Sequence, residues 1–402
     1  MMSVVGDRQK ATVKMSNCES ILKYTRYALL IAGTFDIRNE TTNSSFLYKS
    51  WSLLSQGYYT LFVLSLLVGM KDVLRSGVDD ATFNINMQTF LFSSLLLMKL
   101  VLFYTRRIRD IIKEVYEFEN DITHDDLECT QIYNRNSRYN YKIFFILCVM
   151  TLSTGFLYMF NAFNDWMLMN VGNSMENKTL IYRGWFPFDV GNPIYFNVAY
   201  FFQFPVGIWL PGFIIVFDSL FISMVNFATA RIDILGFKFE NFEMYSDGRN
   251  ESKFHCLRNI VMEHQDLIRY VENVNESLKW YFLGEVLVKS YQITVSLVNV
   301  IHATNKGDLL FYLFIVIGLL LHLIMVYYNA NELSLESTNL CVKIFKSNWY
   351  DQYSEVVRSL SIVMARVQRP LELTIGNFRV IDNDLIVNIF KAGYTFLVYQ
   401  KI

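Results

Sequence analysis

Charged residues are scarce in this sequence, and so are cysteine and proline. Asp, Glu, Lys and Arg make up 18% of the 402 residues, whereas ordinary soluble domains contain about 25%. Five cysteines in a chain of this length exclude a disulfide scaffold. The net charge of −1 lacks the basic excess of a nucleic-acid-binding protein, so we expect no nucleic-acid partner. Apolar residues are abundant instead, at 53% hydrophobic and 16% aromatic, which excludes a disordered chain.

Sequence motifs of enzymes are also missing. The chain has no HExxH, Walker A or GxGxxG motif. Its five histidines are scattered, and no two are spaced as metal ligands on one helix. We therefore expect no enzymatic activity, no cofactor and no metal. His322 lies in a long apolar run, where we expect a hydrogen-bonded structural role, although polar residues inside a membrane are often functional.

Five windows lack charged residues for long enough to cross a bilayer, which takes about 20 apolar residues. They are residues 51–70, 81–98, 143–164, 190–217 and 309–331. Two further candidates are residues 290–304 and the stretch that begins at Leu385. A soluble helical protein would show a polar face every 3.6 residues, and the run from 309 to 331 shows none. The sequence therefore predicts an all-α membrane protein with seven transmembrane helices, surrounded by lipid.

Positive residues alternate between the connections of these spans. Lys and Arg gather in the N-terminal segment and in the second–third, fourth–fifth and sixth–seventh connections. By the positive-inside rule this predicts a cytoplasmic N-terminus and an extracellular C-terminus in the plasma membrane. G-protein-coupled receptors have the opposite orientation. Of the Asn-x-Ser/Thr sequons, only Asn177 falls in a predicted outer loop, so it is the expected glycosylation site.

Long helices are expected beyond the bilayer on the cytoplasmic side. Helical patterns cover residues 219–239, 256–279 and 333–369, while residues 19–35 indicate an amphipathic or re-entrant helix. Loops of this length are usually structured, which favours subunit packing there. We divide the chain into an N-terminal segment (1–48), spans one to six (49–330), a cytoplasmic anchor region (331–376) and a seventh span (377–402).

The last quarter of the chain resembles the insect odorant receptor family. The similar blocks, in order, are residues 331–333, 335–337, 345–350, 364–371, 373–374, 376–378 and 389–397. Residues 185–189, Gln203, Asp218 and residues 257–264 match more weakly. The chain differs from the family at residues 329–331 and at Tyr394-Thr395. These differences, and a short fourth–fifth connection, argue against the shared co-receptor and imply an odorant-specific, tuning subunit.

The resemblance implies a ligand-gated, non-selective cation channel in the membrane of a sensory-neuron dendrite. It implies a heterotetramer with the obligate co-receptor and a small volatile organic ligand. Cytoplasmic helices around Trp349 and Pro370 would anchor the subunits. The end of the seventh span would line the pore through Val398, Gln400 and Ile402. Val398 and Ile402 lie one helical turn apart, and a ring of aliphatic side chains can close a pore by dewetting.

The resemblance places the odorant site in the outer half, between the second, third, fourth and sixth spans. Such a ligand requires an apolar, aromatic pocket with few polar anchors. The candidates are Met87, Phe90, Leu157, Tyr158, Asn161, Tyr200, Gln203, Phe204, Phe311, Tyr312 and Ile315. Asn161 and Gln203 are the expected polar anchors. Each of these residues could equally serve helix packing, because aromatic residues at helical spacing usually do.

Three other functions remain open at this point. The sister family of gustatory receptors has the same topology, although the block around Trp349 and the ending at residues 393–396 favour the odorant branch. A metabotropic seven-span receptor requires the opposite orientation. A secondary transporter should show inverted repeats with broken helices in both halves, and no such pairing is visible.

Overall fold

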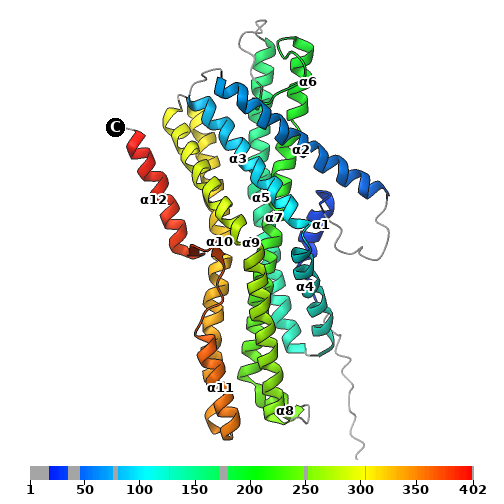
Figure 1. Cartoon of the computed structure of the whole chain (residues 1–402), viewed down its shortest axis with the longest axis vertical. Coiled ribbons are helices and arrows are strands. Elements are labelled where there is room, and N and C mark those ends of the chain that lie inside the picture. The colour runs from blue at the N-terminus through cyan, green and yellow to red at the C-terminus, as the bar shows by residue number, and fades with distance from the viewer. Residues whose placement is uncertain are drawn as a thin grey trace, which may run out of the picture.

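The computed structural model describes residues 18–34, 46–75, 80–125, 127–171, 180–248, 252–303 and 305–400. They form an elongated bundle of helices (Figure 1). The helices are α1 (Lys23–Ile31), α2 (Phe46–Arg75), α3 (Asp80–Phe103), α4 (Arg106–Asp125), α5 (Leu127–Val171), α6 (Pro193–Gln203), α7 (Val206–Glu240), α8 (Phe242–Gly248), α9 (Lys253–His302), α10 (Lys306–Lys346), the 3-10 helix η2 (Trp349–Asp351), α11 (Ser354–Val367) and α12 (Asn383–Gln400). One short antiparallel ribbon, β1 (Thr374–Ile375) with β2 (Arg379–Val380), precedes α12.

Among the described residues, five segments are long and apolar enough to cross a membrane. They are Phe46–Arg75, Phe83–Phe103, Leu127–Met169, Pro193–Glu240 and Lys306–Lys346. These agree with the five uncharged windows of the sequence. The two shorter candidates fall on the C-terminal part of α9 and on α12. Apart from the ribbon, the all-helical prediction agrees with the structure.

Two predicted pairs of segments turn out to be single helices. The cytoplasmic helix expected at 219–239 continues the fourth span as α7, and the one expected at 256–279 continues into the fifth span as α9. The fourth span is instead interrupted at its other end, between α6 and α7. Pro205 is the N-cap of α7. α6 ends just before it, because proline cannot donate the backbone hydrogen bond that would continue the helix.

One predicted helix is wrong in its extent. The segment 333–369 is not continuous: α10 ends at Lys346, and α11 begins only at Ser354. Ser347 has extended backbone geometry, and its hydroxyl donates to the carbonyl of Ile344 at 2.6 Å. Ser side chains compete with the helical backbone for such bonds, and Ser347 is the C-cap at which α10 ends.

The amphipathic segment near the N-terminus forms α1, which is too short to span a bilayer. It packs on α7 and α5, with the Thr25 hydroxyl 3.1 Å from that of Ser223. The backbone around Ile21 is fixed on both sides. Its N–H donates to Glu119 of α4 at 2.8 Å, and its carbonyl accepts from Asn140 of α5 at 2.9 Å.

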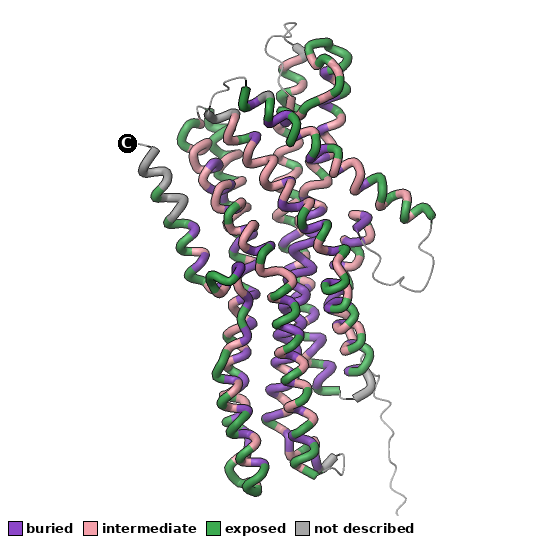
Figure 2. The backbone as a smooth tube through the Cα atoms, viewed as in Figure 1, coloured by how far each residue is buried: buried purple, intermediate pink, exposed green. Residues whose placement is uncertain are grey.

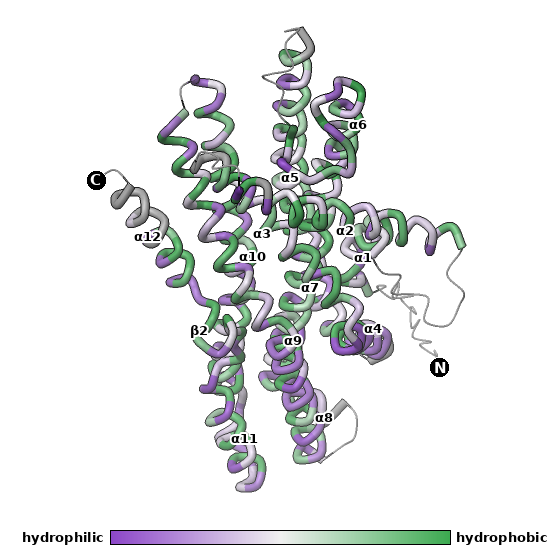
Figure 3. The backbone as a smooth tube through the Cα atoms, turned by 45° about the horizontal axis from the view of Figure 1, so that its top comes forward, coloured by the Kyte–Doolittle hydropathy of each residue, from purple (hydrophilic) through white to green (hydrophobic). Residues whose placement is uncertain are grey.

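The two ends of the bundle differ in polarity (Figure 3). We call the end formed by α4, α8, α11 and the adjoining parts of α5, α7, α9 and α10 the polar end. The other end, with α2, α3, α6 and α12, is the apolar end. The buried core follows the middle of α7, which the other helices surround (Figure 2). Exposed apolar side chains such as Phe156 (69%) and Leu152 (50%) cover α5 outside this core, as expected for a surface that faces lipid.

Candidate ligand-binding site

A loop between α5 and α6 is fastened into the apolar end of the bundle. Its residue Tyr182 is held by Gln203 of α6, whose Oε1 accepts from the Tyr182 N–H at 3.0 Å and whose Nε2 donates to the Tyr182 carbonyl at 2.7 Å. The next residue, Arg183, donates its N–H to Asn86 of α3 at 3.1 Å. Trp185 donates its N–H to the carbonyl of Ser65 on α2 at 2.9 Å. Three helices thus hold one short segment of loop, residues 182–185.

The loop fits because α2 presents a glycine to it. A Cβ added to Gly69 would lie 2.5 Å from the carbonyl oxygen of Arg183 and 3.0 Å from the nitrogen of Trp185. No larger residue leaves room for the loop backbone at this distance. Neither Gly69 nor Tyr182 stands out in the sequence, because no local pattern marks a glycine whose neighbour is a distant loop.

Aromatic rings gather beneath this loop. Tyr158 of α5 stacks on Tyr182, with ring centroids 5.9 Å apart and planes 13° from parallel. Phe311 of α10 packs on the other side, 6.3 Å from the Tyr158 centroid. Phe62 of α2 meets Tyr182 edge to face at 5.3 Å. We call Phe62, Tyr158, Tyr182 and Phe311 the aromatic cluster. Such rings offer broad apolar faces with few polar atoms.

The eleven predicted pocket residues differ in their contacts and burial. Tyr158 and Phe311 belong to the aromatic cluster, and Tyr312 packs on Phe311 at 5.5 Å. The hydroxyl of Tyr200 donates to the Ala162 carbonyl, so this buried residue joins α6 to α5. The remaining predicted residues except Gln203 are half-buried: Met87, Phe90, Leu157, Asn161, Phe204 and Ile315.

The two expected polar anchors differ in their surroundings. Gln203 is fully buried, and both ends of its amide already bind the backbone of Tyr182. It therefore holds the loop that covers the cluster. Asn161 is half-buried on α5, three residues after Tyr158, so the two side chains lie on neighbouring positions of one helix face.

The seventh predicted span is α12, which packs on α9 and α10. The β1–β2 ribbon sets its starting point. Thr374 donates through its N–H to Asn275 of α9 at 2.8 Å, and the N–H of Gly376 donates to the carbonyl of Lys279 at 2.8 Å. Gly376 has a φ of 56°, a conformation that glycine adopts without strain. The chain therefore turns sharply from the polar end into α12.

The predicted pore and glycan residues lie partly outside the described structure. Val398 and Gln400 are in the last turns of α12. Ile402 and the expected glycosylation site Asn177 lie outside the described residues.

The two predicted anchor residues lie at the polar end and are half-buried. Trp349 packs against the core, with Phe345 at 6.1 Å and Tyr350 at 6.3 Å between ring centroids. Pro370 follows the end of α11. Around them are exposed apolar side chains, among them Phe345, Tyr350 and Ile362, each 64% exposed.

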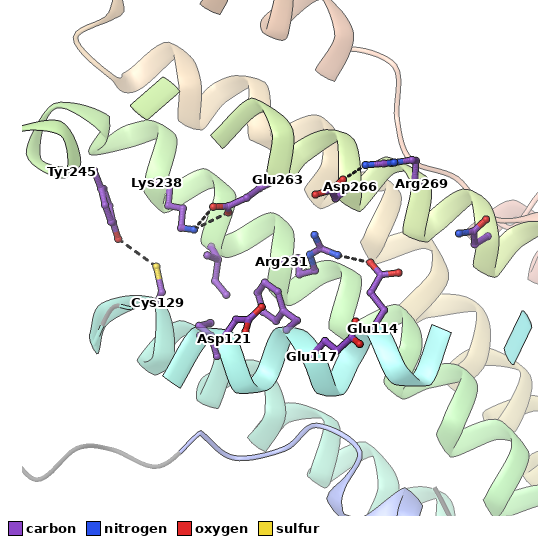
Figure 4. A pocket seen from close by; sticks show the side chains of 14 residues that line it. Glu114, Glu117, Asp121, Cys129, Arg231, Lys238, Tyr245, Glu263, Asp266 and Arg269 are labelled. Carbon is purple, nitrogen blue, oxygen red and sulfur yellow. Dashed lines mark hydrogen bonds and ion pairs between the residues drawn. The ribbon is translucent and has the colours of Figure 1, made fainter. Parts of the chain in front are cut away.

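A cleft of about 610 Å³ lies at the polar end between α4, α5, α7 and α9 (Figure 4). Charged side chains line it and pair across it: Arg231 binds Glu114 at 3.0 Å, and Lys238 binds Glu263 at 2.7 Å. Burial raises the pKa of Glu114, although Arg231 opposes the shift. A cleft lined by this many ions does not suit a small apolar ligand.

Buried charges also meet between α3, α7, α9 and α10. The potential metal-ligating atoms of Asp218, Glu285 and His322 lie within 4.8 Å of one another. However, the Lys99 ammonium lies 2.6 Å from Asp218 and 3.8 Å from Glu285, where it supplies the positive charge. The donor set therefore does not fit a metal ion. His322 Nε2 lies 2.5 Å from Asp218, which confirms its expected hydrogen-bonded role.

The sequence did not predict this cluster, because its members are far apart in the chain. Lys99 and Asp218 are 119 positions apart, and Asp218 and His322 are 104 apart. Only a lysine and an aspartate at the ends of predicted spans, a glutamate shortly before one and a histidine within one hinted at partners within the bundle.

Comparison with known proteins identifies the family. The model of the 7tm Odorant receptor family matches residues 79–394. Odorant receptor 10 of Aedes albopictus is 25% identical over 46% of this chain and 50% of its own length. The putative odorant receptor 92a of Drosophila melanogaster is 22% identical over 73% of this chain and 71% of its own. The match to the Aedes receptor thus spans about half of that protein.

The fold agrees with a solved olfactory receptor. The structure of receptor OR5 from Machilis hrabei in complex with eugenol superimposes with a TM-score of 0.79, covering 94% of this chain and 96% of that one at 16% identity. A second structure of the same receptor gives a TM-score of 0.74. The match of residues 79–394 to the odorant receptor family sets aside a gustatory receptor, a metabotropic receptor and a transporter. The chain is a multi-pass membrane protein that belongs to the insect odorant receptor family.

Proposed function

We propose that this chain is the odorant-specific subunit of an odorant-gated, non-selective cation channel. The observation that supports it most directly is the aromatic cluster under the fastened loop, which joins α2, α5 and α10 at the apolar end. The ligand would lie against these rings, among the eleven residues named above, with Asn161 as its polar anchor. The resemblance to a receptor solved with eugenol supports a small volatile compound as the ligand class.

In this proposal, ligand binding acts on the pore mainly through α10. Phe311 of the cluster lies near the start of α10, and α10 and α9 both contact α12. A ligand that prefers one arrangement of α10 would shift the population of pore states, since a ligand changes an equilibrium only through its differential affinity. In this proposal the end of α12, with Val398, Gln400 and Ile402, lines the pore and residues 377–402 form the pore segment.

Assembly with the co-receptor is the second part of the proposal. Exposed apolar side chains at the polar end, outside the predicted spans, require a covering partner. Trp349 and Pro370 would support this anchor surface from within, in residues 331–376. The departures from the co-receptor pattern noted above support the tuning role, in a heterotetramer at the plasma membrane of a sensory dendrite.

The experiment is an agonist dose series in cells that express the chain with the co-receptor. Tyr158→Ala and Phe311→Ala remove rings from the aromatic cluster, and each is expected to raise the half-maximal concentration roughly tenfold or more, as for a buried aromatic contact. Phe156→Ala is the matched control, because this ring is on the same helix but 69% exposed. Wild-type potency in both cluster variants, at equal surface expression, would show that the ligand binds elsewhere.

A further inference from the structure

Five buried charged or titratable residues form an ion cluster at the meeting point of four helices. Lys99 comes from α3, Asp218 from α7, Glu285 and Lys289 from α9, and His322 from α10. Each is at most 6% exposed. The cluster contains two lysines, two carboxylates and one imidazole.

Hydrogen bonding in this cluster is incomplete. Lys99 donates to Asp218 at 2.6 Å, but its distance to Glu285 is 3.8 Å, which is beyond hydrogen-bonding range. Among the described residues, Glu285 Oε2, His322 Nδ1 and the hydroxyl of the neighbouring Tyr281 are buried atoms without a hydrogen-bond partner. A buried carboxylate oxygen without a partner is costly, and native proteins usually satisfy it with ordered water.

A small, partly open cavity lies beside the unsatisfied atoms of Glu285 and Tyr281. Its volume is about 40 Å³, and Lys99, Asp218, Tyr281 and Glu285 line it together with apolar residues such as Val326. A water molecule needs roughly 10–15 Å³ of such volume and two to four polar partners. The Glu285 carboxylate can accept from it, the Lys99 ammonium can donate to it, and the Tyr281 hydroxyl can do either.

We propose that this cavity is a water-binding site, in which ordered water bridges Glu285 of α9 to Lys99 of α3 and to Tyr281. A metal ion is the poorer occupant, since the Lys99 ammonium would repel it at close range. An empty cavity would leave Glu285 Oε2 and Tyr281 unsatisfied. The bound water extends the direct Lys99–Asp218 pair, so that hydrogen bonds through water and the ion pair together join α3, α7 and α9.

The test is whether a larger side chain in the cavity wall raises or lowers the stability of the protein. Val326→Ile adds one methylene to the cavity wall. In a dry cavity the added group fills space and leaves stability unchanged or higher. In a hydrated cavity it displaces water from Glu285, and the apparent melting temperature of the full chain in detergent should fall by roughly 3 °C or more. Val326→Leu tests the same cavity with a second shape. Val316→Ile, at another buried position on α10, is the control for overpacking.

A second set of variants tests whether the effect of Val326→Ile depends on the cluster. It carries the same substitution in a chain that lacks one charge of each sign. Glu285→Met with Lys289→Met removes one charge of each sign while keeping the side chains long. In this background water has lost its main acceptor, so Val326→Ile should no longer lower the melting temperature. The melting temperatures are measured by fluorescence size-exclusion chromatography, with divalent cations added and with chelator.

Three outcomes would overturn the proposal. Unchanged or raised stability of both Val326 variants in the wild-type chain indicates a dry cavity. An equal loss in both backgrounds indicates simple overpacking. Stabilisation by Zn²⁺ or Ca²⁺ in the wild-type chain, abolished by the Glu285 and Lys289 substitutions, indicates a cation site.

Discussion

Gly69 of α2 lies directly against the backbone of Arg183, such that a Cβ at position 69 would come within 2.5 Å of the Arg183 carbonyl oxygen. Backbone atoms cannot yield as the end of a flexible side chain can. This contact fixes how deeply the loop of residues 182–185 enters the bundle. It therefore also fixes the position of Tyr182 over Tyr158.

Gly69→Val is expected to displace the loop and weaken the ligand response. The half-maximal agonist concentration should rise roughly tenfold or more, because the loss of one well-placed contact in a buried site costs about 1.4 kcal/mol or above. Gly57→Val is the matched control on the same helix, since a Cβ there meets nothing within 4 Å. Equal dose–response curves for the two variants would contradict the role of the loop.

Stability should depend on pH through His264 of α9. Burial first, and the nearby Arg366 second, lower the pKa of His264 from 6.5 to about 4. Between pH 6.5 and pH 4 the unfolded chain binds a proton at this residue and the folded chain does not, so stability falls as the pH falls through this window. The loss is about 3 kcal/mol at the acid limit.

The measurement is the apparent melting temperature of the solubilised chain from pH 7 to pH 4.5. His264→Phe removes the titrating group and should lessen the acid sensitivity, whereas His255→Phe, at an exposed position of the same helix, should leave it as in the wild type. If His264→Phe keeps the full pH dependence, other groups cause it.

Ile362→Asp on α11 should disrupt assembly without unfolding the subunit. The side chain is 64% exposed at the polar end, so a carboxylate costs little in the free chain but is poorly tolerated in an apolar contact. The amount of chain that co-purifies with the co-receptor should fall roughly tenfold. Ser361→Asp, at an exposed neighbouring position, is the control. Equal recovery of both variants would place the subunit contact elsewhere.

Val398→Ala is expected to raise the basal current. In the proposed pore, aliphatic side chains from the subunits form a ring. Shortening Val398 to Ala widens this ring and lessens the dewetting that closes the pore. Val387→Ala is the control, because Val387 is exposed on an earlier turn of α12. Whole-cell recording without agonist compares the two. If Val398→Ala and Ile402→Ala both leave leak current and ion selectivity unchanged, the pore lining must be reassigned.

The sequence predicted the membrane spans well, for a simple reason. A bilayer excludes charge over a fixed length, so residues 309–331 reveal a span through composition alone. The prediction for the anchor region was less accurate, since residues 333–369 have helical periodicity throughout. The structure divides this segment after Lys346, where the Ser347 side chain bonds to the backbone of Ile344, and such local bonding is weakly encoded in periodicity.

The candidate site residues also divide into those that the sequence predicted and those whose contacts only the structure shows. Tyr158, Phe311 and Gln203 were predicted because the family resemblance implies a pocket in the outer half of the spans, and aromatic and polar residues occur there in the sequence. The actual partner of Gln203, the backbone of Tyr182, required the fold.

By itself, then, the sequence predicted the five long apolar helices, because each depends on composition along one stretch of chain. The family resemblance came from short motifs in the last quarter of the chain. The tertiary structure alone decided what meets across the chain. It placed Gly69 against Arg183, Tyr158 on Tyr182, and Lys99 between Asp218 and Glu285. These contacts join residues about 20 to 190 positions apart, and only the packing of helices in three dimensions fixes them.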